Sequence, residues 1–109
     1  MFLDFFDMVD SYEDRKVCNT EINGAIIDTC AVTDSDQSYE TGIEHPSYNN
    51  DNWVIVEMYD TKEEAQIGHA KWVEAFTDKL PESLEDVGTS GISYLIKNIK
   101  EREVYNKQQ

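Results

Sequence analysis

Histidines, cysteines and paired acids are the residues of this chain that could do chemistry, and the histidines are the scarcest. His45 and His69 are the only two. A metal site would need both of them together with carboxylates, but the sequence contains no HExxH motif, no paired CxxC and no complete EF-hand loop. His69 falls on the apolar face of an expected helix, where a hydrogen-bonded core histidine is the commoner role. We therefore predict no metal site.

The sequence also gives little support to covalent or acid–base catalysis. Cys18 and Cys30 fall on expected strands among acidic residues, which raise the pKa of a thiol and disfavour a nucleophile. With 23 Asp and Glu residues in the chain, any pair nominated for glycoside chemistry would be arbitrary. The glycine-containing stretch 88–91 lacks the lysine of a phosphate-binding loop. The sequence thus predicts a non-enzymatic protein with no catalytic residues and no cofactor.

A long polar segment, residues 33–52, holds most of the candidates for partner binding. At about 20 residues it is longer than a compact domain usually leaves without structure, so we expect it to be functional or ordered by a partner. Tyrosines set among polar residues are common at protein contacts because they bring a large area at low entropic cost. The alternative is that these tyrosines fold back over the preceding hairpin. The candidates are Asp34, Asp36, Tyr39, Glu40, His45, Tyr48 and Trp53.

The chain is strongly acidic, with a formal net charge of −14 over 109 residues. Residues 1–52 contain 12 acidic and 2 basic residues, whereas residues 53–109 contain 11 acidic and 7 basic ones. The excess is therefore concentrated in the first half. Direct binding to nucleic acid is disfavoured, because it needs a clustered cationic surface. An acidic surface repels anionic lipid and attracts basic partners; the alternative is that it only keeps the protein in solution.

Length and hydropathy predict a single domain over residues 1–109. No stretch approaches the roughly 20 apolar residues that cross a bilayer. The opening residues 1–7 lack the basic region and cleavage site of a signal peptide. We expect a protein of a reducing cytoplasm that does not bind membranes, with Cys18 and Cys30 as free thiols.

Hydrophobic spacing predicts the elements that must position these side chains. Apolar residues at helical spacing predict an amphipathic helix over residues 2–14. Asn23-Gly24, between two runs rich in β-branched residues, predicts a hairpin of residues 16–22 and 25–32 with a two-residue type I′ turn. That turn pairs Ile22 with Ala25 and places Cys18 opposite Thr29. The faces follow by alternation, with Cys18, Thr20, Ile22, Ala25, Ile27 and Thr29 inside and Asn19, Glu21, Ile26 and Asp28 outside.

The hairpin register also bears on the two cysteines. Cys18 faces Thr29, and Cys30 then lies on the other face of the hairpin. A disulfide between them would need a one-residue slip that inverts a strand, so we reject it.

The second half of the chain predicts one more strand and two helices. Residues 53–59 are apolar on both faces, which indicates a central strand or one whose outer face is covered. Thr61 and Glu64 have the spacing of a capping box and begin a helix that Pro81 ends; within it, Gly68 allows close packing. A last helix is expected from Ile92. The expected fold class is α+β, a small three-stranded, mostly antiparallel sheet (the hairpin plus one central strand) with helices packed on one face.

Part of the sequence resembles a known family. The stretches that carry the likeness are residues 39–49 (YETGIEHPSYN), 53–57 (WVIVE) and 59–65 (YDTKEEA), with Gly68-His69 and Lys71-Trp72-Val73. Over residues 34–76 the chain resembles a group of small uncharacterised acidic proteins of tailed bacteriophages. The resemblance implies a phage origin and a place among virion or host-interaction proteins, but it brings no activity or site residue.

Two hypotheses of different classes follow. The leading one is a non-enzymatic bacteriophage protein that acts through protein–protein contacts, as a virion component of the head, neck or tail. Its partners are other phage structural proteins or further copies of itself, in the host cytoplasm or incorporated in the virion. The alternative is an acidic DNA mimic that inhibits a basic host protein, a nucleic-acid-binding or defence enzyme. Its mimic surface would be Asp4, Asp7, Asp10, Asp14, Glu21, Asp28, Asp34 and Asp36.

Overall fold

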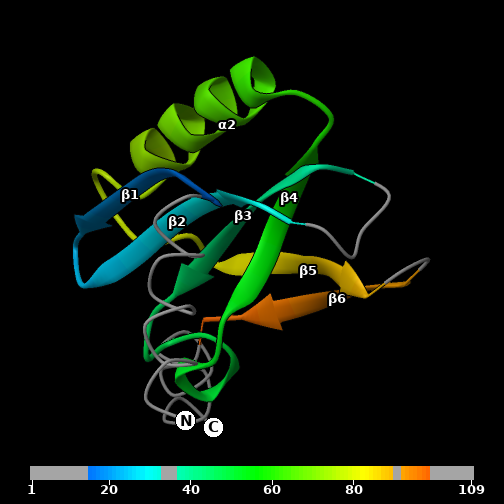
Figure 1. Cartoon of the computed structure of the whole chain (residues 1–109). Coiled ribbons are helices and arrows are strands. Elements are labelled where there is room, and N and C mark those ends of the chain that lie inside the picture. The colour runs from blue at the N-terminus through cyan, green and yellow to red at the C-terminus, as the bar shows by residue number, and fades with distance from the viewer. Residues whose placement is uncertain (1–14, 33–36, 90–91, 99–109) are drawn as a thin grey trace, which may run out of the picture.

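The computed structural model describes residues 15–32, 37–89 and 92–98, which form two sheets, one α-helix and a short 3-10 turn (Figure 1). The predicted helix over residues 2–14 lies outside these residues. Four strands make sheet A: β1 (Lys16–Ile22), β2 (Ala25–Ala31), β3 (Tyr39–Glu44) and β4 (Val54–Tyr59). Two make sheet B: β5 (Ser83–Thr89) and β6 (Ile92–Lys97). The 3-10 turn η1 is Asn49–Asp51 and the helix α2 is Lys62–Ala75.

The expected three-stranded sheet with helices on one face is wrong. Sheet A is antiparallel with the order β1-β2-β3-β4, sheet B is an antiparallel pair, and the described chain contains one helix. Helix α2 packs across sheet A and contacts all four of its strands (Figure 1). Two misassigned segments account for the difference, one between the hairpin and β4 and one at the end of the chain.

The hairpin prediction is confirmed. Ile22 pairs with Ala25 and Cys18 with Thr29, and both turn residues have positive φ, as a type I′ turn requires. Ala25, Ile27 and Thr29 are buried on the inner face. The two cysteines are free, and Cys30 pairs with Lys16 across a register shift.

The expectation of one polar connection over residues 33–52 is wrong, because it contains strand β3. Thr41 and Ile43 are buried on its inner face and pair with Thr29 and Ile27 of β2. The outward residues are Glu40, Gly42 and Glu44, and Gly42 is buried against Trp53 and Ile55. The strand carries few apolar residues, because threonine serves as one of its core-facing side chains.

Strand β4 is confirmed, but it lies at the edge of sheet A rather than at its centre. Its outer face is instead covered by another element, which was the second possibility considered for this strand. Strand β5 packs against β4, and a Cβ added to Gly88 would lie 3.0 Å from Cγ1 of Ile55. A glycine at this position therefore lets the two strands approach closely.

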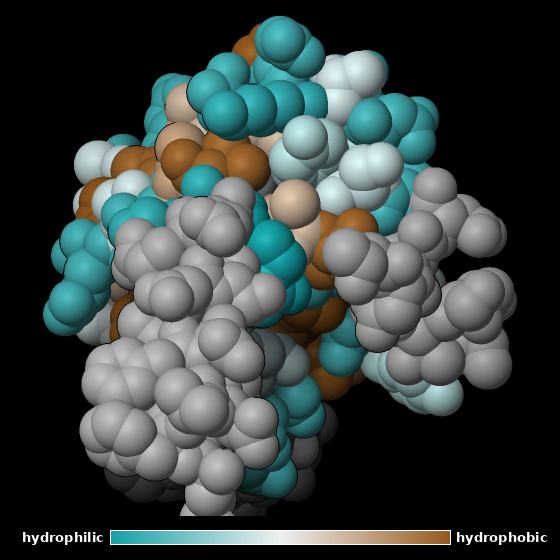
Figure 2. Space-filling model, viewed as in Figure 1, coloured by the Kyte–Doolittle hydropathy of each residue, from teal (hydrophilic) through white to brown (hydrophobic). Residues whose placement is uncertain are grey.

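Helix α2 begins where the sequence predicts and ends early. The side chain of Thr61 accepts a hydrogen bond from the backbone N–H of Glu64, which is the expected N-cap. The helix ends at Ala75, six residues before Pro81, and Phe76 is its C-cap. Figure 2 shows that the surface over α2 is mainly hydrophilic, as its charged outer side chains require.

The expected last helix is wrong, because residues from Ile92 form strand β6. Leu84 pairs with Ile96 and Glu85 with Leu95, so β5 and β6 form an antiparallel pair. The apolar spacing fits a helix as well as a strand over so short a run. Pairing with β5 makes this segment a strand, and β5 itself was not predicted.

The core joins the two sheets to the end of α2. Its buried members are Ala25, Ile27, Ile43, Tyr48, Val54, Val56, Phe76 and Leu84. Beside this cluster, Gly68 lies against Tyr59, where an added Cβ would come within 2.3 Å of the phenol ring. The prediction that Gly68 allows close packing is confirmed.

We expect Gly68→Ala to lower the free energy of unfolding by about 1–3 kcal/mol, because the new methyl group overlaps the Tyr59 ring. At an unobstructed helical site the same change would raise stability by up to about 1 kcal/mol. Chemical denaturation measures the difference. Ala70→Gly on the exposed side of α2 is the matched control, with a loss of about 1 kcal/mol from helix propensity alone. A stabilised Gly68→Ala protein would contradict the packing described here.

Candidate functional site

The structure separates the residues predicted to bind a partner. Tyr39 and Glu40 lie half-buried in β3, and Trp53, next to β4, is 45% exposed. His45 and Tyr48 lie together at the other end of β3, with ring centroids 5.7 Å apart, and both are buried. Asp34 and Asp36 lie outside the described residues.

Tyr48 is a core residue, with 1% of its surface exposed. Its ring packs edge-on against Phe76, with centroids 6.4 Å apart, and its hydroxyl donates to the backbone carbonyl of Pro81. Asn98 also donates to this hydroxyl, at 3.4 Å. The side chain of Tyr48 is therefore folded back into the core, against Phe76.

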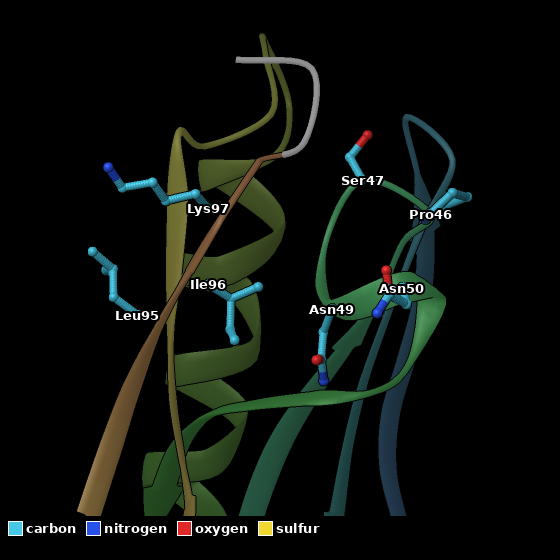
Figure 3. A pocket seen from close by; sticks show the side chains of 7 residues that line it. All are labelled: Pro46, Ser47, Asn49, Asn50, Leu95, Ile96 and Lys97. Atoms are coloured by element: carbon cyan, nitrogen blue, oxygen red, sulfur yellow. The ribbon is translucent and has the colours of Figure 1, made fainter. Parts of the chain in front are cut away.

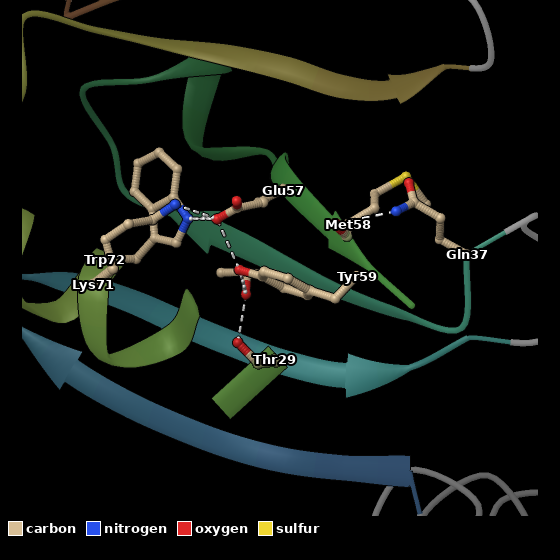
Figure 4. Close-up of polar contacts among 8 residues, drawn as sticks. Thr29, Gln37, Glu57, Met58, Tyr59, Lys71 and Trp72 are labelled. Carbon is tan, nitrogen blue, oxygen red and sulfur yellow. Dashed lines mark hydrogen bonds and ion pairs between the residues drawn. The ribbon is translucent and has the colours of Figure 1, made fainter. Parts of the chain in front are cut away.

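The most extensive polar arrangement is a row of hydrogen bonds between α2 and sheet A, which we call the polar chain. His69 of α2 contacts Thr20 through Nε2 and Thr29 through Nδ1, both at 2.8 Å. The row then crosses sheet A from strand to strand (Figure 4). Its further links are Thr29 to Thr41 at 2.6 Å, Thr41 to the Tyr59 hydroxyl at 2.9 Å, and Tyr59 to Oε1 of Glu57 at 3.1 Å.

The carboxylate at one end determines the direction of every proton in the polar chain. An ionised Glu57 only accepts, so the Tyr59 hydroxyl donates to it and must itself accept from Thr41. The same reasoning makes Thr29 donate to Thr41 and Nδ1 of His69 donate to Thr29. Nδ1 of His69 therefore carries a proton. Because burial lowers the pKa of His69 below 6.5, the imidazole is neutral near pH 7 and Nε2 accepts from Thr20.

The surroundings of the three titratable members agree with this assignment. Burial lowers the pKa of His69 below 6.5, although the charge of Asp28 acts in the other direction. Burial also raises the pKa of Tyr59 to about 12, and the Glu57 charge adds to this while the hydrogen bond from Thr41 opposes it. All three groups thus keep the charge states that the row of hydrogen bonds needs at neutral pH.

Glu57 stays ionised because three donors converge on one oxygen. Burial alone would raise its pKa, but hydrogen bonds from Lys71, Trp72 and Tyr59 and the charge of Lys71 outweigh burial and hold the pKa below its ordinary value. Lys71 Nζ lies 2.7 Å and Trp72 Nε1 2.9 Å from Oε1 (Figure 4). The end of the polar chain is therefore closed by an ion pair at the surface of α2.

The polar chain has the geometry of a structural element. In the described part of the protein every buried side-chain nitrogen or oxygen has a hydrogen-bond partner. The expectation that His69 is a satisfied core histidine is confirmed. Sequence reasoning missed the partnership of Thr41, Tyr59 and Glu57, although Thr20 and Thr29 were placed on the inner face, where a hydroxyl needs a partner.

Within residues 15–32, 37–89 and 92–98, no three His, Cys, Asp or Glu side chains come together in a group that could hold a metal ion. No helix in the same residues has the length and apolar character needed to span a membrane.

A second feature is a hollow of about 380 Å³ between β6 and the turn that follows β3 (Figure 3). Ile96 points into it toward Asn49, whereas Leu95 and Lys97 leave β6 on the other side. Its wall is unusual, because Asn49, Asn50 and Asp51 have successive φ values of 50°, 54° and 67°. A left-handed turn of three residues other than glycine is rare, and Asn and Asp tolerate this region best. The hollow is lined by Pro46, Ser47, Asn49, Asn50, Leu95, Ile96 and Lys97.

Strand β6 forms one side of this hollow and lies at an open edge. In the described chain its only paired neighbour is β5. Tyr94 is 51% and Leu95 63% exposed, on opposite faces of the same strand. An exposed apolar strand edge is a template for pairing, which proteins ordinarily cover or protect with charges. Sequence reasoning missed this surface because it assigned the segment to a helix.

Comparison with known proteins adds no relative: no family model, curated protein or solved structure matches this chain.

We expect Tyr59→Phe to lower the free energy of unfolding by about 1–3 kcal/mol, because Thr41 loses its acceptor and Glu57 one of its donors inside the protein. Denaturant titration of the two proteins measures the loss. Tyr94→Phe, which removes a hydroxyl from an exposed ring, is the control and should change stability by less than about 0.5 kcal/mol. Equal effects of the two substitutions would refute the role of the polar chain.

We expect His69 to carry its proton on Nδ1 and to titrate below pH 6.5 in the folded protein. Because the folded-state pKa is the lower one, the unfolded chain takes up the proton first as the pH falls. The stability that neutral His69 contributes is therefore complete above pH 6.5 and is lost as the pH falls toward the folded-state value. Two-dimensional ¹H–¹⁵N spectra of the imidazoles over a pH series report both properties. A proton on Nε2, or titration above pH 6.5, would break the direction assigned to the polar chain.

Proposed function

We propose that this chain is a non-enzymatic protein of a tailed bacteriophage that acts through protein–protein contacts, as a component of the virion. The observation that carries the contact role is the open edge of β6, with Tyr94 and Leu95 exposed beside the hollow. The resemblance of residues 34–76 to small phage proteins supports the phage origin and the place in the virion.

The charge of β6 suits a contact surface. The strand carries one charged residue, Lys97, in a chain with a net charge of −14. Interface centres are depleted of charged residues and enriched in aromatic ones, whereas the rest of a protein surface is not. The side of α2 that faces away from the sheet differs from β6, because it is rich in charged side chains.

A specific observation also favours the second candidate, the DNA mimic. Glu21 and Asp28 of the expected mimic surface share the outer face of sheet A with Glu40 and Glu44 of β3. Glu21 and Glu44 lie in one row across three strands, through Ile26, so about two strand spacings, or about 10 Å, separate their backbones. The other residues of the expected mimic surface lie outside the described ones.

We expect the chain to be present in purified phage particles and to stay there after a high-salt wash, because an apolar contact is not screened. Mass spectrometry of particles purified from infected cells measures it. Leu95→Lys, placed on the open edge, should reduce incorporation several-fold. Ile67→Lys is the matched control, since Ile67 is 72% exposed on α2, and it should leave incorporation unchanged.

Two results would count against the virion role. One is a chain that is missing from the particles. The other is a chain that holds a basic host protein at low salt and releases it to duplex DNA, which is the behaviour of a mimic.

A further inference from the structure

We infer that the open edge of β6 pairs with the β6 edge of a second copy of this chain, so that two sheets B form one continuous four-stranded sheet. The inference rests on the proposed contact role and names its partner.

Among the described strands, β6 is the edge that lacks protection. Edge strand β1 carries Lys16 and Glu21 and has a register shift after Lys16, both of which discourage pairing with another chain. The other edge of sheet A, strand β4, is packed against β5. In β6, by contrast, residues 92–96 are uncharged, and both faces expose an apolar or aromatic side chain.

The composition of β6 allows two copies of this acidic chain to meet at this edge. Two chains of net charge −14 repel each other, so they can associate only where acidic residues are few. β6 has no acidic residue, and Lys97 is its single charge. Antiparallel pairing of two β6 strands therefore brings no carboxylate opposite a carboxylate.

One register fits the side chains of both copies. A two-fold axis at Leu95 places Leu95 opposite its own counterpart and Ser93 opposite Lys97 of the other copy, all on the outer face of sheet B. On the inner face it places Tyr94 opposite Ile96 of the other copy. A register centred on Lys97 would oppose two like charges, whereas this one opposes none.

The hollow beside β6 is a second observation that favours the register centred on Leu95. Ile96 points into a space of about 380 Å³ that faces the turn at Asn49 (Figure 3). A residue directly opposite Ile96 in an antiparallel pair points to the same side of the sheet. The Tyr94 ring of the second copy would therefore enter the hollow, and the reverse contact would fill the hollow of that copy, as a two-fold interface requires.

Light scattering during size-exclusion chromatography, over a wide range of protein concentration, tests the inference. We expect a dimer that becomes tighter as salt is raised, because salt screens the repulsion between two acidic chains. Leu95→Lys should give a folded monomer, as judged by circular dichroism, since it opposes two lysines at the axis. Ile67→Lys, at a site on α2 that is even more exposed, should remain a dimer.

Cross-linking tests the register in a background in which Cys18 and Cys30 are serine. Leu95→Cys should form a disulfide-linked dimer on oxidation, because the residue faces itself across the axis. Tyr94→Cys, which faces Ile96, should not. A wild-type monomer at every concentration, or a dimer that Leu95→Lys leaves intact, would overturn the inference. Neither result would remove the chain from phage particles, so the proposed function is tested separately.

Discussion

Oε1 of Glu57 is the point where α2 and strand β4 are joined, because Lys71 and Trp72 of α2 donate to it together with Tyr59 of β4. Helix and sheet meet over threonine hydroxyls and an imidazole, which would be costly to bury without partners. The ionised carboxylate gives the row of donors an end point, and Lys71 and Trp72 keep it ionised. An apolar interface would tolerate a rotated helix. In this one, every buried side-chain donor and acceptor of the described residues has a partner, so rotating the helix would break hydrogen bonds.

A close approach of α2 to β4 at Gly68 allows the helix to reach this position. Gly68 faces the ring of Tyr59 with no room for a methyl group, and one turn along the helix Trp72 reaches the Glu57 oxygen. At Gly68 the helix therefore packs against Tyr59 of β4 through its backbone. Ala65 and His69 lie on the same buried face of α2. Packing and hydrogen bonding thus specify the same arrangement of helix and sheet.

Local signals in the sequence predicted the parts of the fold that local physics determines. Asn23-Gly24 determines the hairpin register, Thr61 the start of α2, and the position of His69 on its helix the burial of the imidazole. Strand β3 was missed because its pairing with β2 and β4 compensates for a composition typical of a loop. The apolar residues of β6 fit a helix equally well, and only β5 distinguishes the two. The exposed apolar edge of β6 could not be found before that strand was known.

The shared direction of donation in the polar chain has an evolutionary consequence. Six side chains on α2 and four strands depend on one another, since replacing Thr29 or Thr41 alone would remove one hydrogen bond from each of two neighbours. Sequences that diverge from this one should therefore keep the set together or exchange it together for apolar residues. Covariation among these positions is the pattern that this mutual dependence would leave in such sequences.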